Sequence, residues 1–342
     1  MNKNKLLKTV GIIILIILSI IVIYKVSSVV TSTLNINNKF SPTMLTVNKN
    51  GELYIVDNFN RVEKFSSQGK FIEEIYSKGK NGKHFGSIAG IKLDEQENLY
   101  VLEIDYSKEL QIFSADGKHL RTVTLNKNLK ESSFYKKVYE FFGINNIPTG
   151  FHLPFTISDN SLFIAEINNW SSVKAGNMST NHIVISEYSL TGDFQNRTNI
   201  EINRDGLYSI NDIIVSKNKN IILKEDEQIN IFQSDGKFLK NIRKKDGYFP
   251  YIISSINEDQ ILIMFQNWSL NTTKFDIYNS NGQFIKNIQV DKYDVFHKEA
   301  APQIIYTKEF NKISNDCFDI KLFNNKIYIA NFEKGILSGQ VK

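Results

Sequence analysis

The sequence contains a single cysteine, Cys317, among its 342 residues. One cysteine cannot form an intramolecular disulfide, so packing alone has to hold the fold together. Small secreted modules are more often stapled by several disulfides, which makes that class a poor match. We interpret Cys317 as a buried apolar side chain rather than a reactive thiol, because a lone cysteine in such a chain usually fills space.

The residue patterns of the common catalytic sites are also absent. The chain has no G-x-S-x-G nucleophile motif, no phosphate-binding P-loop, no H-E-x-x-H or C-x-x-C pair and no dinucleotide fingerprint. Their absence favours a function other than catalysis, although it does not exclude an enzyme.

There is little net charge outside the N-terminus. The formal net charge is +5, and Lys3, Lys5, Lys8 and Lys25 contribute +4 of it within a stretch that has no acidic residue. The difference, 5 − 4, leaves +1 for residues 32–342. A nearly neutral domain lacks the basic surface that binds nucleic acid, so we expect no nucleic-acid partner.

One long apolar run is present, and it lies near the N-terminus. Residues 9–24 carry no charge, and VSSVV continues the run beyond Lys25, so that residues 9–30 make a stretch of 22. A helix of this length crosses a hydrocarbon core of about 30 Å. The basic residues before it place residues 1–8 in the cytoplasm and the rest of the chain outside. We predict a retained signal-anchor helix of a single-pass cell-membrane protein, with a cleaved signal peptide as the alternative.

The remainder, residues 31–342, repeats one pattern of four short strands. The first two copies read MLTVNKNGELYIVDNFNRVEKFSSQGKFIEEI and GIKLDEQENLYVLEIDYSKELQIFSADGKHLRTV. The third strand of a copy ends in Phe or Tyr, and a turn glycine follows it. These turn glycines are Gly69, Gly117, Gly192, Gly236 and Gly282, spaced 48, 75, 44 and 46 residues apart. Glycine suits the left-handed position of a tight hairpin.

A period of about 45 residues with four strands per copy is typical of propeller blades. We therefore predict an all-β fold, a six-bladed β-propeller of four-stranded antiparallel blades, preceded by one N-terminal transmembrane helix. The blades are expected to start near residues 42, 88, 153, 210, 250 and 317. The sixth copy ends after its third strand, so we expect residues 33–40, TLNINNKF, to supply the missing fourth strand and close the ring.

Two stretches of this repeat resemble the NHL-repeat propellers. They are ELYIVDNFNRVEKFSSQGKF and GIKLDEQENLYVLE, and the first keeps the D-x-x-N-R-V stretch at Asp57, Asn60, Arg61 and Val62. The resemblance covers about residues 40–335, and the abundance of Asn, Lys and Ile suggests a membrane-anchored bacterial member. It implies the fold but no single activity, because such propellers include scaffolds and enzymes.

Three insertions interrupt the period, at residues 126–150, 167–181 and 291–312. They join blades, or join second strands to third strands, and such connections emerge opposite the turn glycines. We call that end of the ring the insertion face, and the end that carries the turn glycines the turn face. Insertions in repeat proteins often mark the binding face, so we expect a ligand there.

An aromatic residue follows an Asn or Asp after five of the second strands, on the insertion face. The pairs are Asn58-Phe59, Asp105-Tyr106, Asn169-Trp170, Asn267-Trp268 and Asn331-Phe332. Planar rings flanked by amides suit stacking on sugars or gripping an extended peptide. The alternative is structural: the polar side chain starts a turn, and the ring wedges between blades.

The same face carries candidates for metal binding and acid–base chemistry. His84, His152 and His297 lie in predicted blade connections, where three imidazoles can converge on Zn²⁺. Asp57, Glu103 and Glu166 end second strands, where carboxylates usually cap the turn. We therefore expect no cofactor, and keep a metal-assisted lyase or hydrolase with Zn²⁺ or Ca²⁺ at the channel mouth as the alternative. The favoured function is a membrane-tethered extracytoplasmic binding or scaffold module for a peptide, protein or glycan at the cell envelope.

Overall fold

The computed structural model describes residues 41–341 except for 58–59, 76–87, 104–108, 126–153, 169–180, 203–209, 211, 226, 244–245, 271, 291, 298–299, 307–316 and 332–334. The predicted anchor, residues 9–30, therefore lies outside the described residues. Within them, no helix is long and apolar enough to cross a membrane. Residues 1–40 and 41–342 are two separate units by their contacts, and the fold below is that of the second unit.

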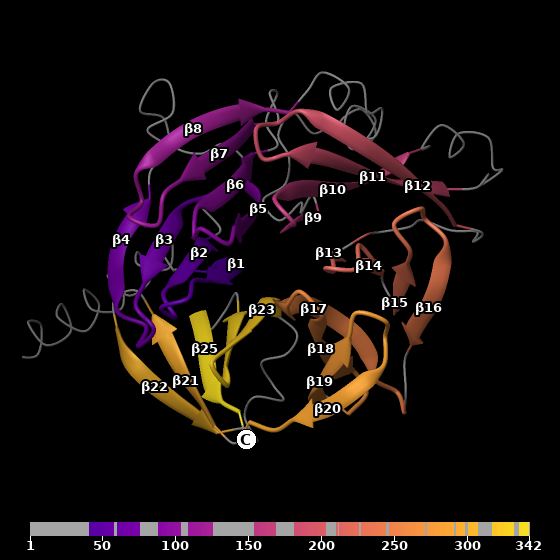
Figure 1. Cartoon of the computed structure of the whole chain (residues 1–342). Helices are drawn as coiled ribbons and strands as arrows, with labels where there is room; N and C mark the ends of the chain where they lie inside the picture. Colours follow the sequence, from indigo (N-terminus) through magenta and orange to yellow (C-terminus); the bar gives the residue numbers. More distant parts are fainter. Residues whose placement is uncertain are drawn as a thin grey trace, which may run out of the picture. The chain divides into compact units, whose positions relative to one another are not determined.

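Six antiparallel sheets form a ring, as the sequence predicts (Figure 1). Blade one comprises β1 (Pro42–Val47), β2 (Leu53–Asp57), β3 (Val62–Phe65) and β4 (Phe71–Ile75), and blade two comprises β5 (Ile88–Leu93), β6 (Leu99–Glu103), β7 (Glu109–Phe113) and β8 (His119–Thr124). Blade three comprises β9 (Phe155–Ser158), β10 (Ser161–Asn168), β11 (Asn181–Ser189) and β12 (Phe194–Ile202), and blade four comprises β13 (Asp212–Val215), β14 (Ile221–Lys224), β15 (Gln228–Phe232) and β16 (Phe238–Arg243). Blade five comprises β17 (Phe249–Asn257), β18 (Gln260–Asn267), β19 (Thr272–Asn279) and β20 (Phe284–Ile288).

The first strand of each blade is the innermost one, and these strands surround the axis of the ring. Each contacts the inner strand of the next blade in the order β1, β5, β9, β13, β17, β23 (Cys317–Phe323), and β23 contacts β1. The inner strands begin within two residues of the positions expected from the repeat. The ring is therefore closed by contacts between blade six and blade one.

The hydrophobic core lies between neighbouring blades. The second strands are sandwiched on both sides, and every residue of β2 is buried. This explains their continuous apolar L-Y-I-V pattern, which is typical of strands that are covered on both faces. The fourth strands are more exposed, and in β4, which reads F-I-E-E-I, Ile72 and Glu73 are exposed and only Ile75 is buried. One core cluster joins Tyr54 and Val56 of blade one to Ile91 and Val101 of blade two, and similar clusters lie between the following blades.

The turns between third and fourth strands repeat one local structure. All five turn glycines have a positive φ, between 76° and 92°, which confirms their predicted left-handed conformation. In each of these blades the last aromatic residue of the third strand meets a ring two residues beyond the glycine, edge to face, at 5.3–5.8 Å between centroids. The five pairs are Phe65–Phe71, Phe113–His119, Tyr188–Phe194, Phe232–Phe238 and Tyr278–Phe284.

The last blade differs from the prediction. Its strands follow the order β22 (Ala300–Tyr306), β21 (Lys292–His297), β25 (Gly335–Gln340), β24 (Lys326–Asn331), β23. The place beside β25 belongs to β21, which pairs with it through Asp294–Ser338 and Phe296–Ile336. We expected residues 33–40, which lie outside the described residues, to occupy that place, and the structure corrects this expectation.

The same finding corrects the interpretation of residues 291–312 as a connection on the insertion face. Residues 292–306 of that segment form the β21–β22 hairpin, which makes the fourth and fifth strands of blade six. The misreading has a physical cause. The hairpin precedes the inner strand of its own blade in the chain, so the order of the repeat does not reveal its partner.

Candidate functional site

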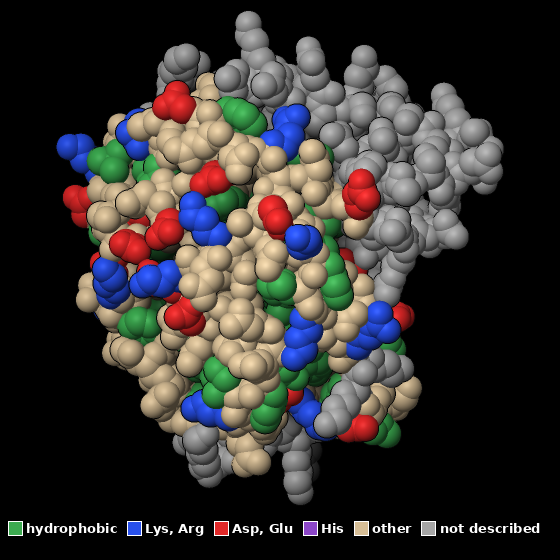
Figure 2. Space-filling view, turned by 45° about the vertical axis from the view of Figure 1, so that its right-hand side comes forward, with side chains coloured by type: hydrophobic (Ala, Val, Ile, Leu, Met, Phe, Trp, Pro, Cys, Tyr) green, Lys and Arg blue, Asp and Glu red, His purple; other side chains and the backbone are tan. Residues whose placement is uncertain are grey.

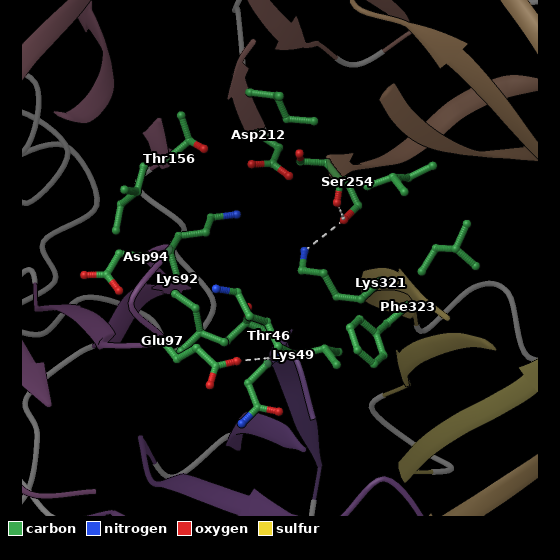
Figure 3. Close-up of a pocket in the computed structure, with 18 of the residues that line it drawn as sticks. Thr46, Lys49, Lys92, Asp94, Glu97, Thr156, Asp212, Ser254, Lys321 and Phe323 are labelled. Atoms are coloured by element: carbon green, nitrogen blue, oxygen red, sulfur yellow. Dashed lines mark hydrogen bonds between the residues drawn. The ribbon is translucent and has the colours of Figure 1, made fainter. Parts of the chain in front are cut away.

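A cavity of about 300 Å³ occupies the centre of the ring (Figure 3). Its walls come from the inner strands of all six blades. Lys49 and Glu97, in the turns after β1 and β5, also line it, and these turns lie at the turn face. The cavity therefore reaches the turn face. The sequence analysis predicts a ligand at the opposite end of the ring, on the insertion face.

The cavity wall follows from the alternation of side chains along the inner strands. In each of these strands one apolar residue packs between blades, and the residue after it faces the axis. The axial residues are Thr46, Lys92, Thr156, Ile214, Ser254 and Lys321. Five of the six are polar or charged, so the middle of the channel has a polar wall.

The ammonium group of Lys321 is bound from two directions. Its Nζ donates to Ser254 Oγ of blade five at 3.1 Å and to Asp319 Oδ1 of its own strand at 3.1 Å. Asp319 also accepts from the backbone N–H of Ile320 at 2.8 Å and, through Oδ2, from that of Leu45 at 3.1 Å. Asp319 thus uses both oxygens and ties blade six to blade one. Burial lowers the pKa of Lys321, although Asp319 opposes that shift.

Lys92 and Asp212 face the same space from β5 and β13 (Figure 3). The carboxylate of Asp212 accepts only the backbone N–H of Ile213, at 2.8 Å, among the described residues. Burial raises the pKa of Asp212, and the positive charges of Lys92 and Lys321 oppose this shift. Lys92 makes no hydrogen bond or ion pair within the part of the chain that the structure describes. We call Lys92 and Lys321 the cavity lysines.

Two of the residues predicted from the sequence lie in a described turn of the insertion face, after β18. Asn267 is buried, and its Oδ1 accepts from the backbone N–H of Leu270 at 3.0 Å, which matches the structural alternative for the Asn position. Trp268 is 49% exposed, and its ring meets that of Tyr251 edge to face at 5.4 Å. The Asn therefore shapes the turn, and the Trp remains accessible.

Most residues of the other predicted aromatic pairs belong to segments outside the described part of the chain. Asn58, Phe59, Tyr106, Asn169, Trp170 and Phe332 lie outside the described residues, as do His84 and His152. Asn331 is described as the last residue of β24 and is fully buried.

His297 does not lie in a connection between blades. It is the last residue of β21, and two strands, β25 and β24, separate β21 from the inner strand β23. His84 and His152 lie outside the described residues, so the site shared by three histidines stays a prediction. Among the described residues, no group of three His, Cys, Asp or Glu side chains is placed to hold a metal ion.

One of the three acidic residues that end second strands, Asp57, has a structural role. Asp57 is buried, and its Oδ1 accepts from the backbone N–H of Arg61 at 3.0 Å while Oδ2 accepts from Arg61 Nε at 2.8 Å. Asn60, at a φ of 56°, accepts from the backbone N–H of Ile88 in blade two at 3.1 Å. The D-x-x-N-R-V stretch therefore builds a turn and joins two blades.

No protein-family model matches this chain, and no curated protein sequence matches it. Solved structures resemble it in fold. The WD40 domain of Neurospora crassa Pan2 matches with a TM-score of 0.50 at 8% identity, over 88% of this chain and 89% of that one. A gluconolactonase from Xanthomonas campestris matches with a TM-score of 0.50 at 9% identity, over 89% of this chain and 87% of that one. The chain is a β-propeller. At these identities the likeness shows the fold alone, and it assigns no activity.

Proposed function

We propose that this chain is a membrane-tethered, extracytoplasmic binding module that recognises a peptide, protein or glycan at the cell envelope through its insertion face. The apolar run of residues 9–30 behind a basic start supports the tether. The ring of blades supports a binding module, because repeat folds often carry their binding face on one side. Lys, Arg, Asp and Glu are intermixed over the surface in Figure 2, which fits a partner other than nucleic acid.

The observation that carries this proposal is the exposed ring of Trp268. The turn that bears it is held by contacts at both ends, because Asn267 Oδ1 accepts from the Leu270 N–H at 3.0 Å and Tyr248 Oη lies 2.8 Å from Thr272 Oγ1. The Trp268 ring itself packs edge to face on Tyr251. Leu270, two residues further on, is 67% exposed. A large aromatic side chain loses little conformational entropy on binding when its orientation is already fixed, and such residues dominate binding energy.

A crosslinking experiment tests the binding role. A photoreactive phenylalanine analogue at position 268 of the full-length protein, expressed in cells, is expected to crosslink to one envelope component. The same analogue at position 284 is the matched control, because Phe284 is 57% exposed and lies after a turn glycine, on the turn face. Equal crosslinking at the two positions, or none at 268, would contradict the proposal.

The purified full-length protein in detergent gives the second arm of the test. Soluble peptidoglycan fragments, which carry both glycan and peptide, are titrated against it and the heat of binding is recorded by calorimetry. Trp268→Ala is expected to weaken binding about tenfold or more without lowering the melting temperature. Phe284→Ala is expected to leave binding unchanged. A loss of folding in Trp268→Ala would instead support the structural alternative for this position.

The tether is tested independently of the ligand. Intact-mass analysis of the membrane fraction is expected to find residues 9–30 still attached to the propeller. Protease added to intact cells is expected to cleave the exported domain. A mature protein that starts near residues 26–33 would refute the anchor and leave the binding module as an exported protein.

A further inference from the structure

Two lysines, Lys92 and Lys321, line the central cavity, and among the described residues only Lys321 is paired with a carboxylate. Asp319 is fully engaged, since it accepts from Leu45, Ile320 and Lys321. Asp212 accepts only the backbone N–H of Ile213 among the described residues, and it makes no ion pair there with either cavity lysine. Lys92 has no bonding partner among the described residues. A lysine that faces a protein cavity without a hydrogen-bonded partner is unfavourable, and a bound anion would supply that partner.

We propose that this cavity binds the oxyanion group, carboxylate or phosphate, of a small hydroxylated molecule between Lys92 and Lys321. The two ammonium groups come from blades two and six and point into one space (Figure 3). Lysine binds such groups as a point charge with three donors, and needs no fixed bidentate geometry. Ser254 already holds the Lys321 ammonium in place at 3.1 Å, so this half of the site is formed before a ligand arrives.

The rest of the wall fits the hydroxyl groups of the same molecule. Thr46 and Thr156 line the cavity, and their hydroxyls make no hydrogen bond within the described part of the chain. Asp212 accepts a single backbone N–H and retains capacity for a ligand hydroxyl. The volume of about 300 Å³ lies at the lower end of the range for small-molecule sites, which restricts the ligand to about the size of a monosaccharide.

The charged groups at the mouth of the cavity form their hydrogen bonds with the turns of the turn face, and none of these bonds reaches a cavity lysine. Asp94 accepts from the backbone N–H and side-chain amide of Asn98 and from the Tyr100 hydroxyl, so both of its oxygens already have donors close to its own turn. Glu97 accepts from the backbone N–H of Lys49, and Lys49 Nζ donates to a backbone carbonyl. The site reaches the turn face and uses none of the residues of the insertion face, so it does not depend on the function proposed above.

Calorimetric titration of the full-length protein at low salt tests the site with matched probes. D-glucuronate and D-glucose have the same ring and hydroxyl groups and differ in the carboxylate, and inorganic phosphate provides an oxyanion without a sugar. We expect glucuronate to bind at millimolar concentrations or below, and glucose to bind at least about tenfold more weakly. Binding of glucuronate is expected to weaken as the salt concentration rises. Binding of phosphate alone would assign the site to phosphorylated ligands.

Variants locate the binding. Lys92→Met keeps the length of the side chain, removes the charge and is expected to weaken glucuronate or phosphate binding about tenfold or more. Lys217→Met is the control, because Lys217 is an exposed lysine in a turn between first and second strands that pairs with Glu258 at 2.9 Å and does not line the cavity. Lys92→Arg, which keeps the charge, is expected to retain binding if Lys92→Met fails to fold.

Three results would overturn the inference: no heat of binding from any of the anions to the wild-type protein, equal affinity for glucose and glucuronate, or unchanged affinity in a folded Lys92→Met. None of them bears on the crosslinking from position 268. The two proposals can therefore fail separately.

Discussion

Gly236 offers a direct measure of how tightly neighbouring blades pack at the turn face. It has a φ of +86°, and a Cβ atom there would lie 2.6 Å from the backbone oxygen of Asn199 and 3.2 Å from Thr198 Cγ2. Both neighbours belong to β12 of the preceding blade. Gly117 occupies the same position of blade two at a φ of +76°, but its nearest neighbour is the flexible end of Glu73 at 3.5 Å.

The pair separates backbone strain from contact between blades. Alanine at either position adopts a left-handed conformation, which costs about 1–2 kcal/mol of unfolding free energy. At Gly236 the new methyl group also has to push a backbone carbonyl away, and overpacking of this kind adds about 1–3 kcal/mol. We therefore expect Gly236→Ala to lose roughly 2–5 kcal/mol and Gly117→Ala only about 1–2 kcal/mol.

Thermal melting followed by circular dichroism measures the difference. Gly236→Ala is expected to lower the melting temperature at least about twice as much as Gly117→Ala, since each kcal/mol corresponds to a few degrees in a domain of this size. Equal losses in the two variants would refute the reasoning. They would mean that β12 moves aside for the new methyl group without loss of stability, and that the positive φ alone requires glycine at both positions.

Three further predictions rest on single contacts. Asp57→Ala is expected to cost about 2–3 kcal/mol of unfolding free energy, because the Arg61 guanidinium and the Arg61 backbone N–H lose the carboxylate that accepts from them. Urea titration measures this loss, and a loss no larger than that of an ordinary surface substitution would contradict the prediction. Burial raises the pKa of Asp212 above the ordinary value of 3.8, so the wild-type protein should lose stability as the pH rises through the raised value. Asp212→Asn should therefore melt like the wild type in acid and at a higher temperature near neutral pH, whereas a lower melting temperature there would show that the cavity lysines stabilise the ionised form. Phe238→Ala should lower the unfolding free energy by only about 0.5–1.5 kcal/mol, because Phe238 pairs edge to face with Phe232 and is 56% exposed. A larger loss, measured in the same urea titration, would contradict this prediction.

The ring of blades was predictable because one local structure recurs with a fixed spacing. A turn glycine with an aromatic residue on each side of it marks the third and fourth strands of five blades, and the structure places all five glycines in the left-handed region. The L-Y-V pattern marks the second strand because that strand is covered on both sides. These signals are local, so a single sequence reveals them.

The closure of the ring was not predictable in the same way. The segment 292–306 lacks the turn glycine and aromatic pair of the other blades. Its partner β25 lies more than thirty residues further along the chain and carries small side chains, Gly335, Ser338 and Gly339 among them. Residues 33–40 and residues 292–297 were both candidates for the strand that pairs with β25. The choice between them depends on tertiary packing, which a local sequence pattern does not show.

The cavity was missed because the insertions directed attention to the other face. A usable signal was nevertheless present, since a lysine interrupts the apolar inner strands in G-I-K-L of blade two and D-I-K-L of blade six. A charged residue in the middle of the innermost strand has only the channel to face. Comparing equivalent positions of the six inner strands would have brought Lys92 and Lys321 together.

The position of β25 between β24 and β21 sets an order for biogenesis. As the chain is synthesised, β21 and β22 appear before the strand that attaches them to blade six, so the hairpin has no sheet to join until residues 335–340 emerge. Until then the nascent protein presents the open edges of β24 and β21, and such edges favour aggregation. A ribosome that stops a few residues early would therefore leave an unsealed propeller, which exposes it to quality-control proteases and chaperones.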